Sequence, residues 1–199
     1  MSFYSIKHSK FAYRIDFALY GVAILTMAAF LLLTGSMERW LEFVALAVAG
    51  LASWTFIEYI LHRFVMHGLR PFKQWHAQHH QQPTAIIYTP TIVSMGLFAT
   101  LVFLPALILL NNVQSAFALT LGVVSGYLFY SMLHHATHHS SRLAIQHQSA
   151  WLKRRKRWHA MHHQNTEKAS CFGVTNGFWD HAFGSYLHPK KIRERLVDK

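Results

Sequence analysis

Two copies of one histidine pattern stand out in this sequence, each directly after a tryptophan. The first is WHAQHH, which begins at Trp75, and the second is WHAMHH, which begins at Trp158. Both copies have histidines at i, i+3 and i+4, positions that lie on one face of an α-helix. Each copy is therefore expected to direct three imidazoles toward one point.

Two pairs of histidines accompany the repeats. His62 and His67 come from HRFVMH, and His134 and His138 come from HHATHH. The second pair is separated by about one helical turn and shares a face. The first pair, at i and i+5, diverges on an ideal helix and converges only if that helix bends or ends near Gly68.

Ten imidazoles suit two metal ions better than one. A structural zinc ion takes four ligands, whereas five for each of two ions is a natural division. Imidazole nitrogen suits iron, zinc, copper and nickel. A lone histidine is more often a satisfied polar residue than a ligand, but repeated triplets with two pairs indicate a polynuclear metal site. The predicted ligands are His62, His67, His76, His79, His80, His134, His138, His159, His162 and His163.

Five more residues are predicted to support the ligands or to act as alternative ligands. They are Glu58, His135, His139, Asp180 and His181. Glu58 lies one turn before His62 and could accept the second N–H of that ring. His135 and His139 are rotated by about 100° from His134 and His138, so they are expected to lie behind the ligands.

Four apolar segments must position these groups. The chain is 52% hydrophobic and only 14% charged, against about a quarter charged in soluble domains. Each segment approaches or exceeds the roughly 20 residues that cross a bilayer. The predicted spans are about 17–36, 40–61, 92–110 and 113–133, with a kink at Pro105 in the third.

Very short links join the spans into two helical hairpins. We therefore expect an all-α integral membrane protein, one domain over 1–199, with four transmembrane helices. A histidine-rich helical cap is expected from 62–91 and 134–199. The four-span pattern argues against a cleaved signal peptide.

The charge distribution predicts which side of the membrane carries the cap. Of the 19 Lys and Arg residues only Arg39 lies in a hairpin tip, and the other 18 lie on the histidine side. That side, with both termini and the metal site, is expected to be cytoplasmic. The net charge of +11 does not indicate nucleic-acid binding, because the cations lie between long apolar segments. The single cysteine, Cys171, excludes a Cys-rich zinc module and an internal disulfide.

The histidine motifs and the tail FGVTNGFWDHAFG resemble the fatty acid hydroxylase/sterol desaturase superfamily of membrane di-iron oxygenases. The resemblance covers about residues 50–187 and is greatest to the fatty acid (ceramide) 2-hydroxylases. It implies O2-dependent hydroxylation of an unactivated C–H bond in a lipid, most simply 2-hydroxylation of a fatty-acyl chain. It also implies two iron ions, with zinc able to replace them in a purified sample. The ten histidines carry over as ligands, Asp180 as the residue that holds the tail against the site, and no other catalytic residue is implied.

The resemblance also bears on redox partners. The cytochrome b5 domain of eukaryotic members is absent from this sequence, so an external donor of cytochrome b5 or ferredoxin type is expected. No glycine-rich nucleotide fingerprint follows a strand, so no redox cofactor besides metal is expected. The basic stretch WLKRRKRW, residues 151–158, indicates an anchor at the membrane boundary. A docking face for an acidic electron donor is the alternative, and the two are compatible.

Two other functions are compatible with the sequence. One is hydroxylation or desaturation of a sterol or carotenoid within the same superfamily. The other is a non-catalytic metal-handling membrane protein such as a zinc transporter. A transporter would place ionisable ligands near the bilayer midplane, where these spans have none, so this alternative is less favoured.

Overall fold

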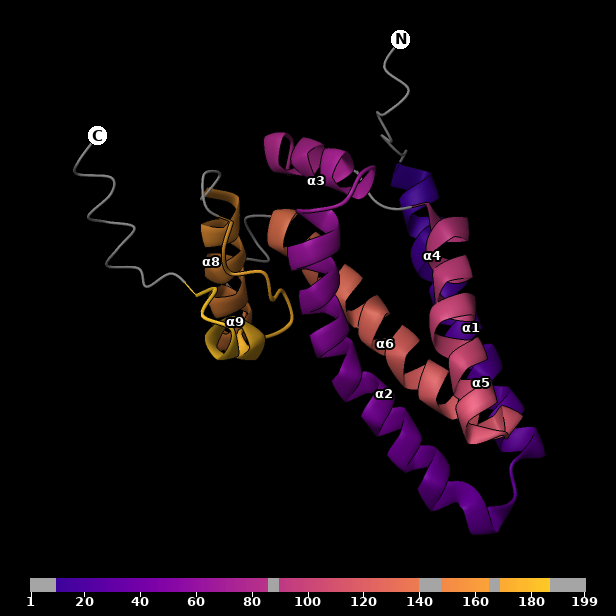
Figure 1. Ribbon diagram of the computed structural model, residues 1–199. Coiled ribbons are helices and arrows are strands. Elements are labelled where there is room, and N and C mark those ends of the chain that lie inside the picture. The colour runs from indigo at the N-terminus through magenta and orange to yellow at the C-terminus, as the bar shows by residue number, and fades with distance from the viewer. Residues whose placement is uncertain (1–9, 86–89, 140–147, 165–168, 187–199) are drawn as a thin grey trace, which may run out of the picture.

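The computed structural model describes residues 10–85, 90–139, 148–164 and 169–186, and every regular element within them is a helix. Four of the helical segments are long and apolar enough to cross a membrane. They are Tyr13–Thr34, Met37–Met66, Thr91–Leu110 and Val113–His138. The predicted all-α membrane fold with four spans is confirmed (Figure 1).

The second and third spans each contain a turn of π-helix. The first hairpin consists of α1 (Lys10–Thr34), the short helix η1 (Met37–Arg39) and α2 (Trp40–Ile60), which continues as the π-helix η2 (Leu61–Met66). The second consists of α4 (Thr91–Phe98), the π-helix η3 (Ala99–Phe103), α5 (Leu104–Leu110) and α6 (Val113–His138). The interruption in the third span comes directly before Pro105, whose ring nitrogen cannot donate to the preceding turn.

Helices α2 and α6 cross closely because glycines line their contact. A Cβ added at Gly50 would meet the Leu119 carbonyl, and one at Gly122 would meet the Ala47 carbonyl. A Cβ at Gly126 would meet the side chain of Trp54. Small residues permit such close contact between membrane helices.

The two hairpin tips meet at one end of the molecule. Arg39 donates to Glu42 at 2.9 Å and to Ser115 at 2.8 Å, and Ser115 donates to Glu42 at 2.6 Å. The side chain of Asn112 caps α6 by accepting from the Ser115 amide at 2.9 Å. These contacts hold the two hairpins in register at the end remote from the histidines.

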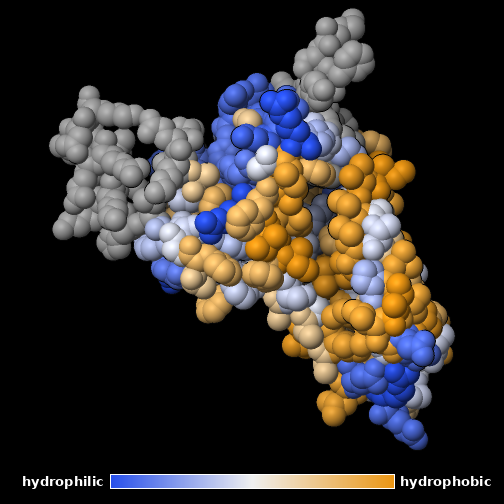
Figure 2. All heavy atoms as spheres, in the orientation of Figure 1, coloured by the Kyte–Doolittle hydropathy of each residue, from blue (hydrophilic) through white to orange (hydrophobic). Residues whose placement is uncertain are grey.

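The cap consists of α3 (Phe72–Gln81), α8 (Ala150–Gln164) and α9 (Phe178–Ala182) at the other end (Figure 1). Figure 2 shows hydrophobic side chains along the spans and hydrophilic ones at the hairpin tips and over α3. The expected histidine-rich helical cap is therefore present. Both chain termini lie outside the described residues, and the sidedness of the cap stays a prediction.

Candidate metal centre

The ten histidines gather into two groups of five. In each group, one ring nitrogen of every residue lies within 4.8 Å of those of all the others. The first group is His62, His67, His76, His80 and His162. The second group is His79, His134, His138, His159 and His163.

The two repeated triplets divide between the groups. On α3, His76 and His80 belong to the first group and His79 to the second. Helix α8 has the reverse division, with its i and i+4 residues in the second group and its i+3 residue, His162, in the first. The expectation that each triplet meets at one point is wrong. On a helix the i+4 residue lies only about 40° from residue i, whereas the i+3 residue lies about 100° from the i+4 residue.

The π-helix η2 brings His62 and His67 together. Its hydrogen bonds run from i to i+5, so residues five apart stack on one face. The centroids of the two rings are 5.4 Å apart. The helix ends immediately afterwards, near Gly68. His62 and His67 therefore converge because the second span ends in a turn of π-helix instead of an ideal α-helix.

Helix α6 presents His134 and His138 to the second group. Gly126 and His134 are two four-residue steps apart, along the ridge by which helices pack against each other. His135 and His139 lie outside both groups, with their rings stacked 4.4 Å apart. The packing of α6 thereby selects between the two pairs, which local spacing alone leaves ambiguous.

The nitrogen spacing in both groups fits a common metal ion. Nε2 of His76 lies 3.0 Å from Nε2 of both His62 and His80. In the second group, Nε2 of His159 lies 2.8 Å from that of His138 and 3.1 Å from that of His163. Nitrogens bound at right angles, each about 2.1 Å from one ion, are about 3.0 Å apart.

Hydrogen bonds fix the orientation of two rings in the first group. Nδ1 of His62 donates to the Phe172 carbonyl at 2.5 Å, and Nδ1 of His162 donates to the Ser170 carbonyl at 2.7 Å. A neutral imidazole that donates from Nδ1 carries a lone pair on Nε2. These lone pairs point at neighbouring ring nitrogens, an arrangement that a cation between them would stabilise.

In the second group, buried ring nitrogens without hydrogen-bond partners also indicate a site for a cation. Both ring nitrogens of His79 are buried and have no hydrogen-bond partner among the described residues, so one of them is available to a cation. The unpartnered Nδ1 atoms of His159 and His163 are not the Nε2 atoms by which these rings approach the group. Such groups are costly to bury unless something satisfies them. The donor set therefore fits metal ions in both groups.

Burial keeps the cap imidazoles neutral. Burial lowers the pKa of His67 to about 4 and that of His163 to about 3, with nearby imidazoles adding to the effect. The pKa values of His76, His159 and His162 are lowered well below the usual value, again mainly by burial. Neutral imidazole is the form that binds metal.

Asp180 holds the loop that supplies the two carbonyls, residues 170–175. Its fully buried carboxylate accepts from the amides of Phe172 and Gly173, both at 2.8 Å, and from the Ser185 hydroxyl at 2.8 Å. The indole of Trp158 donates to it at 3.3 Å. Asp180 thus ties α9 to the 170–175 loop, and in the described part of the chain its carboxylate accepts these hydrogen bonds and none from the ten gathered histidines. That this contact holds the tail against a working metal site stays a prediction.

Glu58 holds the same loop and does not contact His62 as expected. Its carboxylate accepts from the Val174 amide at 2.5 Å, the Thr175 amide at 3.0 Å and the Thr175 hydroxyl at 2.5 Å. The 170–175 loop lies along α2, so its Phe172 carbonyl reaches His62 while its amides reach Glu58. The expectation of a direct Glu58–His62 bond is wrong for that reason. Main-chain carbonyls leave no mark in the sequence, so these partners could not be found from it.

His181 lies outside both groups. Its exposed ring packs against Trp158 and Tyr186, with centroids 5.6 and 4.4 Å away. Neither His181 nor the pair His135 and His139 joins the ten gathered nitrogens.

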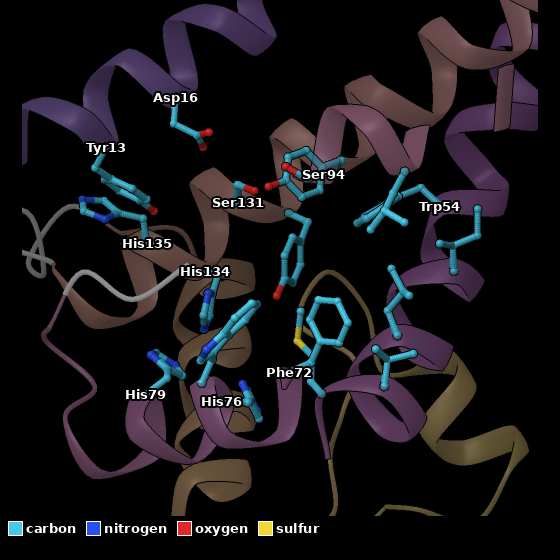
Figure 3. A pocket seen from close by; sticks show the side chains of 18 of the residues that line it. Tyr13, Asp16, Trp54, Phe72, His76, His79, Ser94, Ser131, His134 and His135 are labelled. Carbon is cyan, nitrogen blue, oxygen red and sulfur yellow. The ribbon is translucent and has the colours of Figure 1, made fainter. Parts of the chain in front are cut away.

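An apolar cavity of about 270 Å³ leads to the two groups (Figure 3). Its wall on the second span is formed by Trp54 and Ile57 of α2 and by Leu61 and Val65 of η2, which recur at helical spacing. Figure 3 shows Trp54 at one end and His76, His79 and His134 at the other. The cavity therefore connects the interior of the spans with members of both histidine groups.

These features define a class: a membrane-spanning helical protein with paired five-histidine sites at one end of an apolar cavity. The chain belongs to the fatty acid hydroxylase family, whose model matches residues 47–185.

Several relatives are similar in sequence to this chain over 70–77% of its length. Fatty acid 2-hydroxylase of Mus musculus is 32% identical over 164 residues, which cover 74% of this chain and 42% of the relative. Dihydroceramide fatty acyl 2-hydroxylase FAH1 of Arabidopsis thaliana is 30% identical over 77% of this chain and 65% of the relative. Ceramide very long chain fatty acid hydroxylase SCS7 of Saccharomyces cerevisiae is 33% identical over 70% of this chain and 37% of the relative. The chain thus spans about two fifths of the mouse and yeast relatives and about two thirds of the plant one.

One solved structure is similar over most of the fold. It is described as full-length Scs7p with only the hydroxylase domain visible. The TM-score is 0.70 and the sequence identity 28%, over 86% of this chain and 65% of that one.

Proposed function

We propose that this chain is a membrane enzyme that hydroxylates carbon 2 of a fatty-acyl chain. The reaction would use O2 and electrons from an external donor of cytochrome b5 or ferredoxin type. The proposal is supported by family membership and by relatives named as fatty acid and ceramide hydroxylases. The observation that carries it is the apolar cavity that ends at members of both histidine groups.

Each five-histidine group would hold one metal ion, iron in the native protein. Bound iron would supply the O2 activation needed to functionalise an unactivated C–H bond. Zinc also accepts imidazole ligands, so a purified sample could hold zinc instead. The ligands proposed are the ten gathered histidines, and no other side chain needs to act as acid or base.

The chain's own residues would position the substrate and exclude water. The cavity is lined along the second span from Trp54 to at least Leu61, seven residues further on or about 10 Å of helix. An acyl tail in this space would replace water along an apolar wall. Its carboxyl-end carbons would then lie beside His76, His79 and His134.

The proposal predicts new products in a host that makes no 2-hydroxy fatty acids. Cells that express the chain should contain 2-hydroxy acyl lipids by mass spectrometry, and His79→Ala should abolish them. His181→Ala, which removes an exposed histidine outside both groups, should retain them. Feeding sterols or carotenoids tests the alternative substrates in the same assay. Two metals per purified chain with hydroxylated sterol or carotenoid as the only product would reject the fatty-acyl assignment.

A further inference from the structure

A second cavity, of about 240 Å³, is lined by residues of α8, of α9 and of the segment directly before α9. None of the ten gathered histidines lines it. Arg154, Arg155 and His181 do, and no acidic residue is found among the lining residues of the described chain. The cavity is therefore lined by cationic and neutral groups and is separate from the metal centre.

Arg155 is buried in the middle of an otherwise solvated basic run. Residues 153–157 are all Lys or Arg, yet Arg155 is only 5% exposed. Its guanidinium lies 5.0 Å from the ring centroid of Trp158. Its Nη1 is buried and has no hydrogen-bond partner among the described residues. A buried cationic donor without a partner is costly, so this nitrogen calls for an acceptor that the described residues do not supply.

The neighbouring carboxylates do not supply that acceptor. Burial lowers the pKa of Arg155, and the charges of Glu58 and Asp180 oppose this only in part. In the described part of the chain, no ion pair within 4.0 Å joins Arg155 to either carboxylate. Both carboxylates instead accept hydrogen bonds from amides of the 170–175 loop. They balance charge in the region but leave the Arg155 donor unused.

Aromatic side chains place this cavity at the membrane boundary. Trp151 and Phe178 line it and are 47% and 64% exposed. The Trp151 ring stacks on Phe129 of α6 with centroids 6.1 Å apart, and Phe129 belongs to the fourth span. Exposed aromatic residues at this level are typical of the headgroup region.

We propose that this cavity binds the phosphate of an anionic membrane phospholipid. Arg155 and Arg154 would donate to the phosphate oxygens, a pairing that suits the planar guanidinium. Trp151 and Phe178 would contact the lipid next to its headgroup. This site goes beyond the proposed reaction, and its occupancy does not depend on hydroxylase activity.

The test is a titration of the purified full chain, in non-ionic detergent, with dioctanoyl phosphatidylglycerol, followed by native mass spectrometry. Arg155→Gln should weaken binding about tenfold or more, the effect of one lost charge-assisted hydrogen bond. Arg154→Gln, which changes an exposed lining residue, should weaken it several-fold. Arg157→Gln is the matched control, because it removes the same charge from an exposed position outside the cavity lining.

Three outcomes would overturn the proposal. Equal weakening by Arg154→Gln and Arg157→Gln would show diffuse attraction to the basic run. Inorganic phosphate that binds as tightly as the lipid would show a free-anion site. Absence of any bound phosphatidylglycerol in the unsubstituted chain would exclude the site. If Arg155→Gln does not fold, the comparison of Arg154→Gln with Arg157→Gln still decides.

Discussion

Two main-chain carbonyls orient two imidazole rings in the first histidine group. The carbonyls of Phe172 and Ser170 fix His62 and His162 in the tautomer that leaves Nε2 unprotonated. Carbonyls serve this purpose only if their loop is rigid, and Asp180 and Glu58 supply that rigidity by accepting four of its amides. The two carboxylates therefore influence the orientation of the rings indirectly, by holding the loop whose carbonyls accept hydrogen bonds from those rings.

Asp180→Asn should weaken the metal site without removing a ligand. The amide side chain cannot accept at both of its terminal atoms, so either the Phe172 or the Gly173 amide loses its partner. We expect a loss of about 1–3 kcal/mol in stability and a roughly 10- to 100-fold loss in metal affinity. Thermal unfolding and metal content after dialysis measure the two effects. Glu38→Gln makes the same chemical change at an exposed side chain of the hairpin tip and should retain both properties.

At the scale of the helices, the sequence indicates which helices exist but not which histidine of each helix belongs to which of the two groups. The four spans follow from apolar length, and the ten histidines follow from repetition and spacing. The division of each triplet between two groups depends on how α3 and α8 are placed relative to each other, which no local pattern contains. The choice of His134 over His135 likewise depends on the glycine contact between α6 and α2.

The π turn η2 can be tested by moving one histidine. The double substitution Met66→His and His67→Met changes the spacing from i+5 to i+4. An ordinary α-helix would bring such a pair together, whereas η2 should turn the new side chain away. We expect loss of metal from the first group, measured as metal per chain by elemental analysis. Retention of full metal content would mean that the span ends as an ordinary α-helix.

The α2–α6 contact predicts that alanine substitutions at two glycines differ sharply in their effect on stability. A Cβ at Gly122 would press on the Ala47 carbonyl and the Leu51 amide, so Gly122→Ala should destabilise the fold by about 1–3 kcal/mol. Gly96→Ala adds the same methyl group where nothing lies within 4 Å and should be neutral or slightly stabilising. Thermal unfolding in detergent compares the two variants. Equal transition temperatures would contradict close packing of α2 on α6.

At the scale of the whole molecule, the two ends of the helical bundle differ in both structure and charge. The hairpin tips cluster at one end, and the histidine cap with its basic helix α8 lies at the other (Figure 1). The structure fixes this polarity within the chain. The cytoplasmic location of the cap remains a prediction from the distribution of Lys and Arg.

Cysteine labelling tests that orientation. Met37→Cys lies in a hairpin tip where the native side chain is 84% exposed, and the native Cys171 is fully buried and should contribute little background. In intact cells a membrane-impermeant maleimide should label Met37→Cys. Lys153→Cys, on exposed α8, should be labelled only after permeabilisation. The reverse pattern would place the cap on the outer side.

The position of the 170–175 loop in the chain has a consequence for maturation. Both histidine groups include residues of α8, and the loop that orients two rings of the first group is synthesised after α8. All four spans therefore leave the ribosome before either group can be completed. If the two groups hold ions as proposed, their uptake would be completed late, after the spans have been synthesised. A nascent chain that stops at residue 164 would contain all ten gathered histidines yet lack the backbone that orients His62 and His162.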